Sequence, residues 1–190
     1  MNIDIETGLL DMARQCPSPN HDERPEGCTP DLIVLHNISL PPYEFGTQAI
    51  DQLFTNQLDP AAHPFFATIN HLRVASHVLI RRSGEIVQYV PFHKRAFHAG
   101  ISCYRGRERC NDFSIGIEIE GTDFVPFSAR QYQQLEQLLP VLVTAYPTLN
   151  LEHITGHEYI APGRKTDPGP FFNWQRLSRA LGVTLPACAQ

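Results

Sequence analysis

The clearest strand pattern in the chain is the segment F-S-I-G-I-E-I-E-G, in which apolar and polar residues alternate strictly. Such alternation places Ile115, Ile117 and Ile119 on one face of a strand. Gly116 and Glu118 then share the opposite face, where the glycine leaves room beside the carboxylate for a ligand or a stretch of backbone. The alternative interpretation is the solvated face of an edge strand, on which carboxylates are ordinary.

Runs of branched and aromatic residues predict further strands. Residues 32–35 form a continuous apolar run, which is typical of a strand buried on both faces. Residues 76–80 and 85–90 flank a short charged link that contains Gly84, and this pattern predicts a β-hairpin. Residues 153–157 predict a short final strand.

Helical periodicity appears in four segments, and the longest carries the strongest signals. Ser128 and Gln131 form the S-x-x-Q pattern of a capping box, and leucines follow at helical spacing along one face. Pro140 lies inside this pattern and predicts a kink or a split. Asn173 and Gly182 are a suitable cap and stop for the last helix. The predicted helices cover residues 7–15, 47–54, 128–146 and 173–181.

Length and composition fit one globular domain over residues 1–190, with 42% hydrophobic and 18% charged residues. Residues 1–30 predict a largely irregular N-terminal arm, and the tail at residues 186–190 is expected to be disordered. The net charge of −5 gives no general attraction to nucleic acid. No apolar run approaches the roughly 18–20 residues that span a bilayer. We therefore expect neither nucleic acid nor a membrane as a partner.

The N-terminal segment and the cysteines both indicate a cytoplasmic location. The first residues are acidic and lack the basic and apolar regions of a signal peptide. The cysteines are odd in number and contain no C-x-x-C pair, so reduced thiols are the natural interpretation. They are Cys16, Cys28, Cys103, Cys110 and Cys188.

Candidate chemistry centres on the loop G-H-E-Y-I-A-P-G-R-K-T-D-P-G-P, whose prolines and glycines resist regular structure. It carries His157, Lys165 and Asp167, and a rigid loop with these groups is a suitable wall for a site. His36 follows the apolar run at residues 32–35, at a strand end where ligands gather in α/β proteins. The alternatives are an ordinary polar surface loop and a hydrogen-bonded core histidine.

Two imidazoles and one carboxylate, with an open fourth position, form a ligand set of catalytic zinc. His36, His157 and Asp167 supply these groups, although only folding can bring such distant positions together. Zinc would make hydroxide available near neutral pH. Glu118 could take and return the proton, and Lys165 could stabilise a negative tetrahedral oxygen. Together these groups would hydrolyse an amide.

A second interpretation is a glycosidase without a metal, in which Glu118 and Glu120 form the carboxylate pair. The two glutamates lie two positions apart on one predicted strand, so both would approach a substrate from the same side. A glycosidase pair must flank the bond that it cleaves. The amidase interpretation is therefore preferred.

Three segments resemble the AmpD family of cytoplasmic 1,6-anhydro-N-acetylmuramoyl-L-alanine amidases. They are V-L-H-N-I-S-L-P-P, R-E-R-C-N-D-F-S-I-G-I-E and R-K-T-D-P-G-P, and the resemblance runs in order from about Pro17 to Trp174. This family belongs to the zinc amidases related to phage T7 lysozyme and the peptidoglycan recognition proteins.

The resemblance implies an α/β (α+β) fold, in which a central mixed β-sheet is flanked by helices and one zinc ion lies on one face of the sheet. It implies His36, His157 and Asp167 as the zinc ligands. Glu118 matches the catalytic acid and base of the family, and Lys165 matches the cation that stabilises the transition state.

The resemblance also implies four substrate-binding residues. Arg73 and Arg109 match positions that hold the carboxylates of the stem peptide, a task suited to a fork-shaped guanidinium. Asn37 and Phe97 match positions that touch substrate. Phe97 stands where a tryptophan is expected, so a smaller ring should line the pocket at this position.

The implied reaction cleaves the amide between the lactyl group of 1,6-anhydro-N-acetylmuramic acid and L-alanine, during peptidoglycan recycling. Removing these muropeptides would keep the inducer of β-lactamase low in a host with that circuit. The expected partner is the anhydromuropeptide substrate, and the expected state is a monomer. The alternatives are an amidase of intact peptidoglycan and a non-catalytic muropeptide-binding protein with the same fold.

Overall fold

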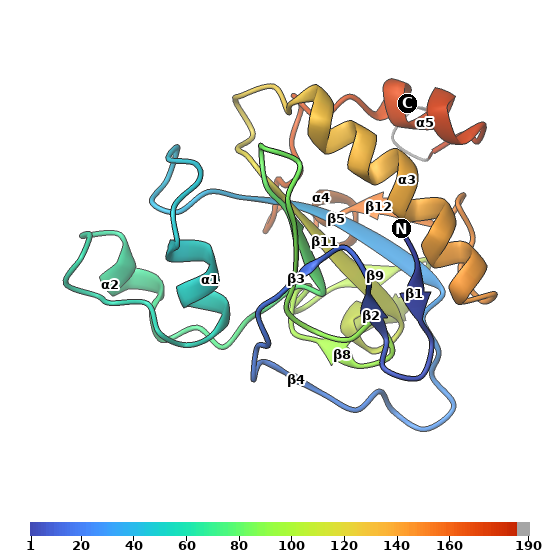
Figure 1. Ribbon diagram of the computed structural model, residues 1–190, viewed down its shortest axis with the longest axis horizontal. Coiled ribbons are helices and arrows are strands. Elements are labelled where there is room, and N and C mark those ends of the chain that lie inside the picture. Colours follow the sequence, from blue (N-terminus) through green and yellow to red (C-terminus); the bar gives the residue numbers. More distant parts are fainter. Residues whose placement is uncertain (186–190) are drawn as a thin grey trace.

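The computed structural model describes residues 1–185, and its centre is a six-stranded mixed sheet (Figure 1). Strands β6 and β7 pair antiparallel, and the other neighbouring strands pair parallel. The expected mixed sheet and the predicted hairpin are thereby confirmed. In spatial order the strands are β12 (Ile154–Gly156), β5 (Leu32–Ile38), β11 (Ser114–Glu120), β6 (Val78–Ile80), β7 (Ile86–Gln88) and β3 (Arg14–Gln15).

The helix predicted over residues 7–15 is wrong, because this segment forms β2 (Leu9–Leu10) and β3. A helix of this length is marginal by itself, whereas the segment gains partners by lying along the sheet. Strand β3 pairs with β7, and the backbone N–H of Leu10 donates to Gln88 Oε1 at 2.8 Å. The two-stranded sheets are β1 (Ile3–Asp4) with β2, β4 (His21–Asp22) with β8 (Arg95–Ala96), and β9 (Cys103–Tyr104) with β10 (Arg107–Glu108).

The longest helix begins at the predicted capping box. Ser128 Oγ accepts from the backbone N–H of Gln131, and Gln131 Oε1 accepts from the backbone N–H of Ser128. Pro140 lies inside this helix without splitting it. Among residues 1–185, none of the helices combines the length and the apolar character of a membrane crossing. The helices are α1 (Ala49–Phe54), α2 (Phe66–Ile69), α3 (Ala129–Ala145), α4 (His157–Ile160), α5 (Trp174–Leu181) and the short 3₁₀ helix η1 (Cys110–Asp112).

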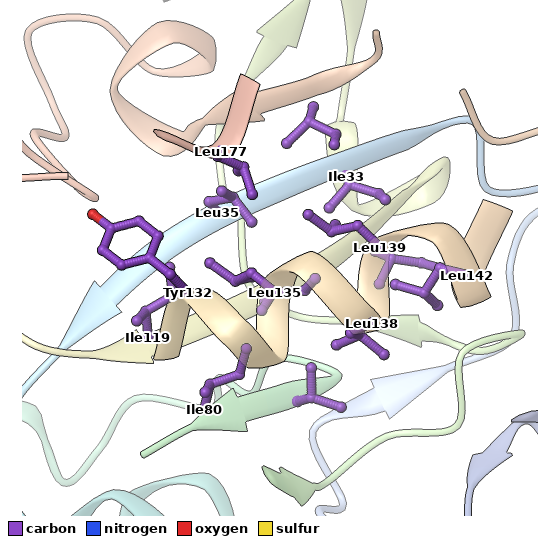
Figure 2. Packing of buried hydrophobic residues seen from close by; sticks show 14 of the residues in the cluster. Ile33, Leu35, Ile80, Ile119, Tyr132, Leu135, Leu138, Leu139, Leu142 and Leu177 are labelled. Carbon is purple, nitrogen blue, oxygen red and sulfur yellow. The ribbon is translucent and has the colours of Figure 1, made fainter. Parts of the chain in front are cut away.

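One face of the sheet is covered by α3 and α5, and Figure 2 shows how the apolar side of α3 points into it. Every second residue of the two central strands turns toward these helices, as strand geometry requires. Burial of each large aliphatic side chain stabilises the fold by roughly 1.5–3 kcal/mol. The residues of this layer include Ile33, Leu35, Ile115, Ile117, Ile119, Leu135, Leu138, Leu139, Leu142 and Leu177.

The opposite face of the sheet is shared between α1 and a polar region. Ile50 and Phe54 of α1 pack with Leu79 and Val87, and these contacts cover the part of the sheet formed by β6 and β7. The remaining part, over β12, β5 and β11, carries polar side chains at the strand ends. The interpretation of β11 as a solvated edge strand is wrong, because β11 lies between β5 and β6 and all its residues are buried.

Candidate metal and catalytic site

Three adjacent parallel strands bring the candidate residues together. Glu118 of β11 is the register partner of His36 of β5, so their side chains lie side by side on the same face. Gly156, the last residue of β12, pairs with Leu35. His157 therefore emerges beside His36, at the same edge of the sheet.

Asp167 completes a compact group of three potential ligands. The Nδ1 atoms of His36 and His157 are 3.0 Å apart, and Asp167 Oδ2 lies 2.9 Å from the first and 3.0 Å from the second. Ligands at about 2.0–2.1 Å from a tetrahedral zinc stand about 3.3 Å from one another. The three atoms thus form a slightly contracted face of such a tetrahedron.

The outer nitrogens of both imidazoles have partners of their own. His157 Nε2 lies 2.9 Å from the carbonyl oxygen of Ala99, which can only accept, so this nitrogen carries the proton. His36 Nε2 lies 2.9 Å from His98 Nδ1. Burial lowers the pKa of His36 to about 4, which keeps its ring neutral. Neutral imidazole is the form that binds a metal, so the group fits a divalent cation.

The loop that carries Asp167 is fastened to the end of β12. The backbone N–H of Glu158 donates to the carbonyl oxygen of Asp167 at 2.9 Å. Pro168 packs so closely against Gly156 that a Cβ atom at position 156 would stand 2.8 Å from its ring. A glycine is required there, because any side chain would push the loop and its carboxylate away.

Glu118 lies beside His36 and has a buried carboxylate oxygen that no hydrogen bond engages. Its residue is 9% exposed, and Oε2 has no hydrogen-bond partner. Burial, helped by the nearby charge of Asp167, raises the pKa of Glu118 well above its usual value, and Lys165 opposes this shift. Strongly shifted carboxylates in clefts are typical of groups that transfer protons.

These groups open into a cavity of about 580 Å³. Its wall includes the three potential ligands together with Glu118 and Lys165. Lys165 is exposed and belongs to the same loop as Asp167, so its ammonium can reach the cavity from the solvent side. The rim is apolar in part and carries the exposed side chains of Tyr43, Phe65, Leu72 and Phe124.

Two of the four predicted substrate residues line this cavity. The Asn37 side-chain amide donates to Asp123 Oδ1 at 2.7 Å and to the carbonyl oxygen of Pro168 at 3.1 Å, so its orientation is fixed. Phe97 also lines the cavity, and the Arg95 guanidinium stands 5.9 Å from the centre of its ring.

The other two predicted substrate residues, Arg73 and Arg109, lie outside the cavity wall formed by residues 1–185. Arg73 Nη1 donates to the carbonyl oxygens of Asn70 and Leu72. The Arg109 side chain is 70% exposed and pairs with Asp112 at 3.2 Å. Neither side chain is brought to the three potential ligands, although Leu72, next to Arg73, forms part of the rim.

Glu120, the second carboxylate of the glycosidase interpretation, serves the structure instead. It is 1% exposed and accepts from the backbone N–H groups of Gly46 and Arg82 at 2.6 and 3.0 Å. Its Oε1 also lies 3.4 Å from Arg81 Nη1. Because both oxygens are engaged, Glu120 ties the loop before α1 to the central sheet.

Replacing Glu120 by alanine should lower the free energy of unfolding by about 3–5 kcal/mol, because the backbone N–H groups of Gly46 and Arg82 would lose their acceptor and Arg81 would lose one of its carboxylate partners. Glu85→Ala is the matched control, because Glu85 also pairs with Arg81 but its side chain is 42% exposed. The control should cost less than about 1 kcal/mol. Urea unfolding of both variants, at one fixed zinc concentration, measures the difference. Equal losses would contradict the role given to Glu120.

His98 is not among the residues to which the sequence assigned a role, yet it lies directly beside His36. The sequence did contain one indication of its position, which is the glycine at position 116. A Cβ atom at this position would stand 2.5 Å from the His98 ring. The space predicted beside Glu118 is therefore taken by this imidazole. Burial, followed by the neighbouring His36 and His77, lowers the pKa of His98 well below its usual value.

Comparison with known proteins gives concordant matches over most of the chain. Residues 26–170 match the family model of N-acetylmuramoyl-L-alanine amidase. The 1,6-anhydro-N-acetylmuramyl-L-alanine amidase AmpD of Escherichia coli K12 is 62% identical over 173 residues, which cover 91% of this chain and 94% of that protein. A crystal structure of a selenomethionine AmpD derivative superimposes with a TM-score of 0.91 at 60% identity, covering 97% of this chain and 100% of that chain.

A further solved structure carries a ligand. It is the complex of the amidase AmiD from E. coli with the substrate anhydro-N-acetylmuramic acid-L-Ala-D-γ-Glu-L-Lys. The match has a TM-score of 0.59 at 31% identity and covers 85% of this chain and 61% of that chain.

Proposed function

Because this chain belongs to the N-acetylmuramoyl-L-alanine amidase family, we propose that it hydrolyses the amide between the lactyl group of 1,6-anhydro-N-acetylmuramic acid and L-alanine. The observation that carries this proposal is the triangle of His36, His157 and Asp167 beside the unpaired carboxylate oxygen of Glu118. The name of the E. coli relative and the substrate in the AmiD complex support the choice of an anhydromuropeptide.

We infer that His36, His157 and Asp167 hold one zinc ion through two Nδ1 atoms and one carboxylate oxygen. Two nitrogen ligands and one oxygen ligand, with a position left for water or substrate, form a set typical of catalytic zinc. When bound, zinc supplies a Lewis acid that polarises the scissile carbonyl and makes water a nucleophile near neutral pH.

Glu118 acts as the base and then the acid of the reaction. Its carboxylate accepts the proton of the attacking water and returns it to the nitrogen of L-alanine as the amide bond breaks. Register pairing with His36 holds this carboxylate beside the metal ligands. The raised pKa of Glu118 suits the second step, in which the protonated form is needed.

Lys165 stabilises the negative charge that develops on the former carbonyl oxygen. The stabilisation by this cation would grow as bound substrate displaces water from the cavity, because the local dielectric constant then falls. Its place on the wall of the cavity, two residues before Asp167, supports this role.

Substrate is held by groups on the floor and rim of the cavity. Asn37 has a fixed amide, and Phe97 offers a ring to the sugar. Arg73 and Arg109 remain our candidates for the carboxylates of the stem peptide, although both point elsewhere here. A long, exposed arginine side chain can reorient on binding at little cost.

We place the reaction in the cytoplasm, as part of peptidoglycan recycling, with the protein acting as a monomer. Within residues 1–185 the cysteines Cys16, Cys28, Cys103 and Cys110 are all free. Free thiols are typical of reducing compartments, which supports this location.

Hydrolysis of purified anhydromuropeptide, followed by mass spectrometry, tests the reaction and the metal together. We expect cleavage at the lactyl–alanine amide, loss of activity after a zinc chelator removes the metal, and recovery when zinc is added back. Activity that survived complete removal of zinc would overturn the metal assignment.

A parallel assay on intact sacculi separates the alternatives. Faster turnover of sacculi than of soluble anhydromuropeptide would favour an amidase of intact peptidoglycan. A zinc-loaded protein that binds muropeptide but cleaves neither substrate would instead be a binding protein of the same fold.

A further inference from the structure

His98 lies between the metal-binding group and the central strand β11. Its ring fills the space above Gly116 and meets the His36 ring edge-on, with the ring centres 5.1 Å apart. The loop that carries it is fixed by Asn111, whose Oδ1 accepts from the backbone N–H groups of His98 and Ala99 at 3.2 and 2.8 Å.

A chain of hydrogen bonds runs from the backbone of η1 through His98 to His36. Ser114 Oγ lies 2.6 Å from the carbonyl oxygen of Cys110, which can only accept, so the hydroxyl proton points there. Ser114 Oγ also lies 3.0 Å from His98 Nε2 and must accept from it. His98 Nε2 therefore carries the proton of a neutral ring.

The direction of these hydrogen bonds decides which nitrogen of His36 carries the proton. With its proton on Nε2, the neutral His98 ring has a lone pair on Nδ1, and this atom stands 2.9 Å from His36 Nε2. Only a proton on His36 Nε2 makes that contact a hydrogen bond. The lone pair of His36 then lies on Nδ1, the atom that faces His157 and Asp167.

We propose that His98 is a positioning residue, which fixes the tautomer and the ring orientation of His36 so that Nδ1 faces the metal. The proposal rests on the zinc site of the proposed function. In the same loop, the backbone carbonyl of Ala99 accepts from His157 Nε2 and so fixes the tautomer of that ring. One loop, held by Asn111, therefore orients both imidazoles of the site.

Zinc affinity of His98 variants, measured by competition with a chromophoric chelator, tests the proposal. His98→Phe keeps the ring but removes the acceptor, and we expect it to weaken zinc binding roughly 10- to 100-fold, as loss of outer hydrogen-bond partners does elsewhere. His98→Asn places an amide oxygen about where Nδ1 stands, so most of the affinity should return.

His77→Phe is the matched control for a merely structural effect. His77 is fully buried against the same strand, where its Nδ1 accepts from the backbone N–H of Gly116 at 3.0 Å, but it makes no hydrogen bond to His36, His157 or Asp167. The control should lower the melting temperature while leaving zinc affinity nearly unchanged. If His98→Phe binds zinc as tightly as the natural protein, the proposal is wrong.

Long-range ¹H–¹⁵N spectra of the zinc-loaded natural protein give a test that needs no variant. We expect His36 with its proton on Nε2 and His98 with its proton on Nε2. A proton on His36 Nδ1 would overturn the proposal even if the variants fail to fold. Failure of the natural protein to bind zinc at all would instead overturn the proposed function.

Discussion

Glu118→Ala is expected to lower kcat by about 10²- to 10⁴-fold, the usual contribution of a positioned acid and base, while zinc stays bound. The carboxylate is the proposed carrier of the proton from water to the leaving nitrogen, and its Oε2 has no other partner. Turnover of anhydromuropeptide measures the loss of activity, and the zinc content of the same samples shows whether the metal stays bound. Full turnover by a zinc-loaded Glu118→Ala protein would remove Glu118 from the mechanism.

Glu118→Gln sharpens this test, because it keeps the size of the side chain and removes its ability to carry the proton. The variant should be as inactive as Glu118→Ala. Its zinc-free form should nevertheless melt at a higher temperature than the natural protein, since a buried and unpaired carboxylate is replaced by a neutral group. A gain in stability with a loss of activity is the mark of a residue kept for function.

Asp167→Ala is expected to weaken zinc binding by more than about 100-fold, a larger effect than loss of an outer partner, because one of three protein ligands disappears. Asp167 Oδ2 is the atom that closes the triangle with the two imidazoles. Thr166→Ala is the matched control, since Thr166 is an exposed neighbour in the same loop and is not part of the triangle. Chelator competition measures both variants.

Unchanged zinc affinity in Asp167→Ala would exclude this carboxylate from the metal. Loss of affinity in Thr166→Ala as well would show that the loop, rather than the carboxylate, sets the affinity. Only a large effect at position 167 with little effect at position 166 agrees with the assignment.

The elements with strong local patterns were predictable from the sequence. Strict alternation located β11, and the capping box at Ser128 located the start of α3. Asn173 and Gly182 likewise marked the ends of α5. In each case the pattern that predicts the element lies within a few neighbouring residues and does not depend on distant parts of the chain.

The features that could not be predicted depend on pairing between residues that are far apart in the sequence. Residues 7–15 have a weak helical pattern, and their partner Gln88 is far away in the chain. The three candidate ligand residues were singled out by their side-chain chemistry and by the resemblance. Their approach to within about 3 Å depends on the parallel register of β12, β5 and β11. The role of His98 was out of reach for the same reason, because its partners Ser114 and His36 come from different strands.

The register between β5 and β11 constrains the positions of His36 and Glu118, whereas it does not constrain the residues of the cavity rim. The backbone ladder pairs His36 with Glu118, so a shift of either strand by one residue would turn one of the two side chains away from the cavity. Tyr43, Phe65 and Phe124 stand on three separate segments outside this ladder. Substitutions at the rim can therefore reshape the mouth of the cavity one segment at a time, whereas His36 and Glu118 keep their relative positions as long as the two strands keep their register.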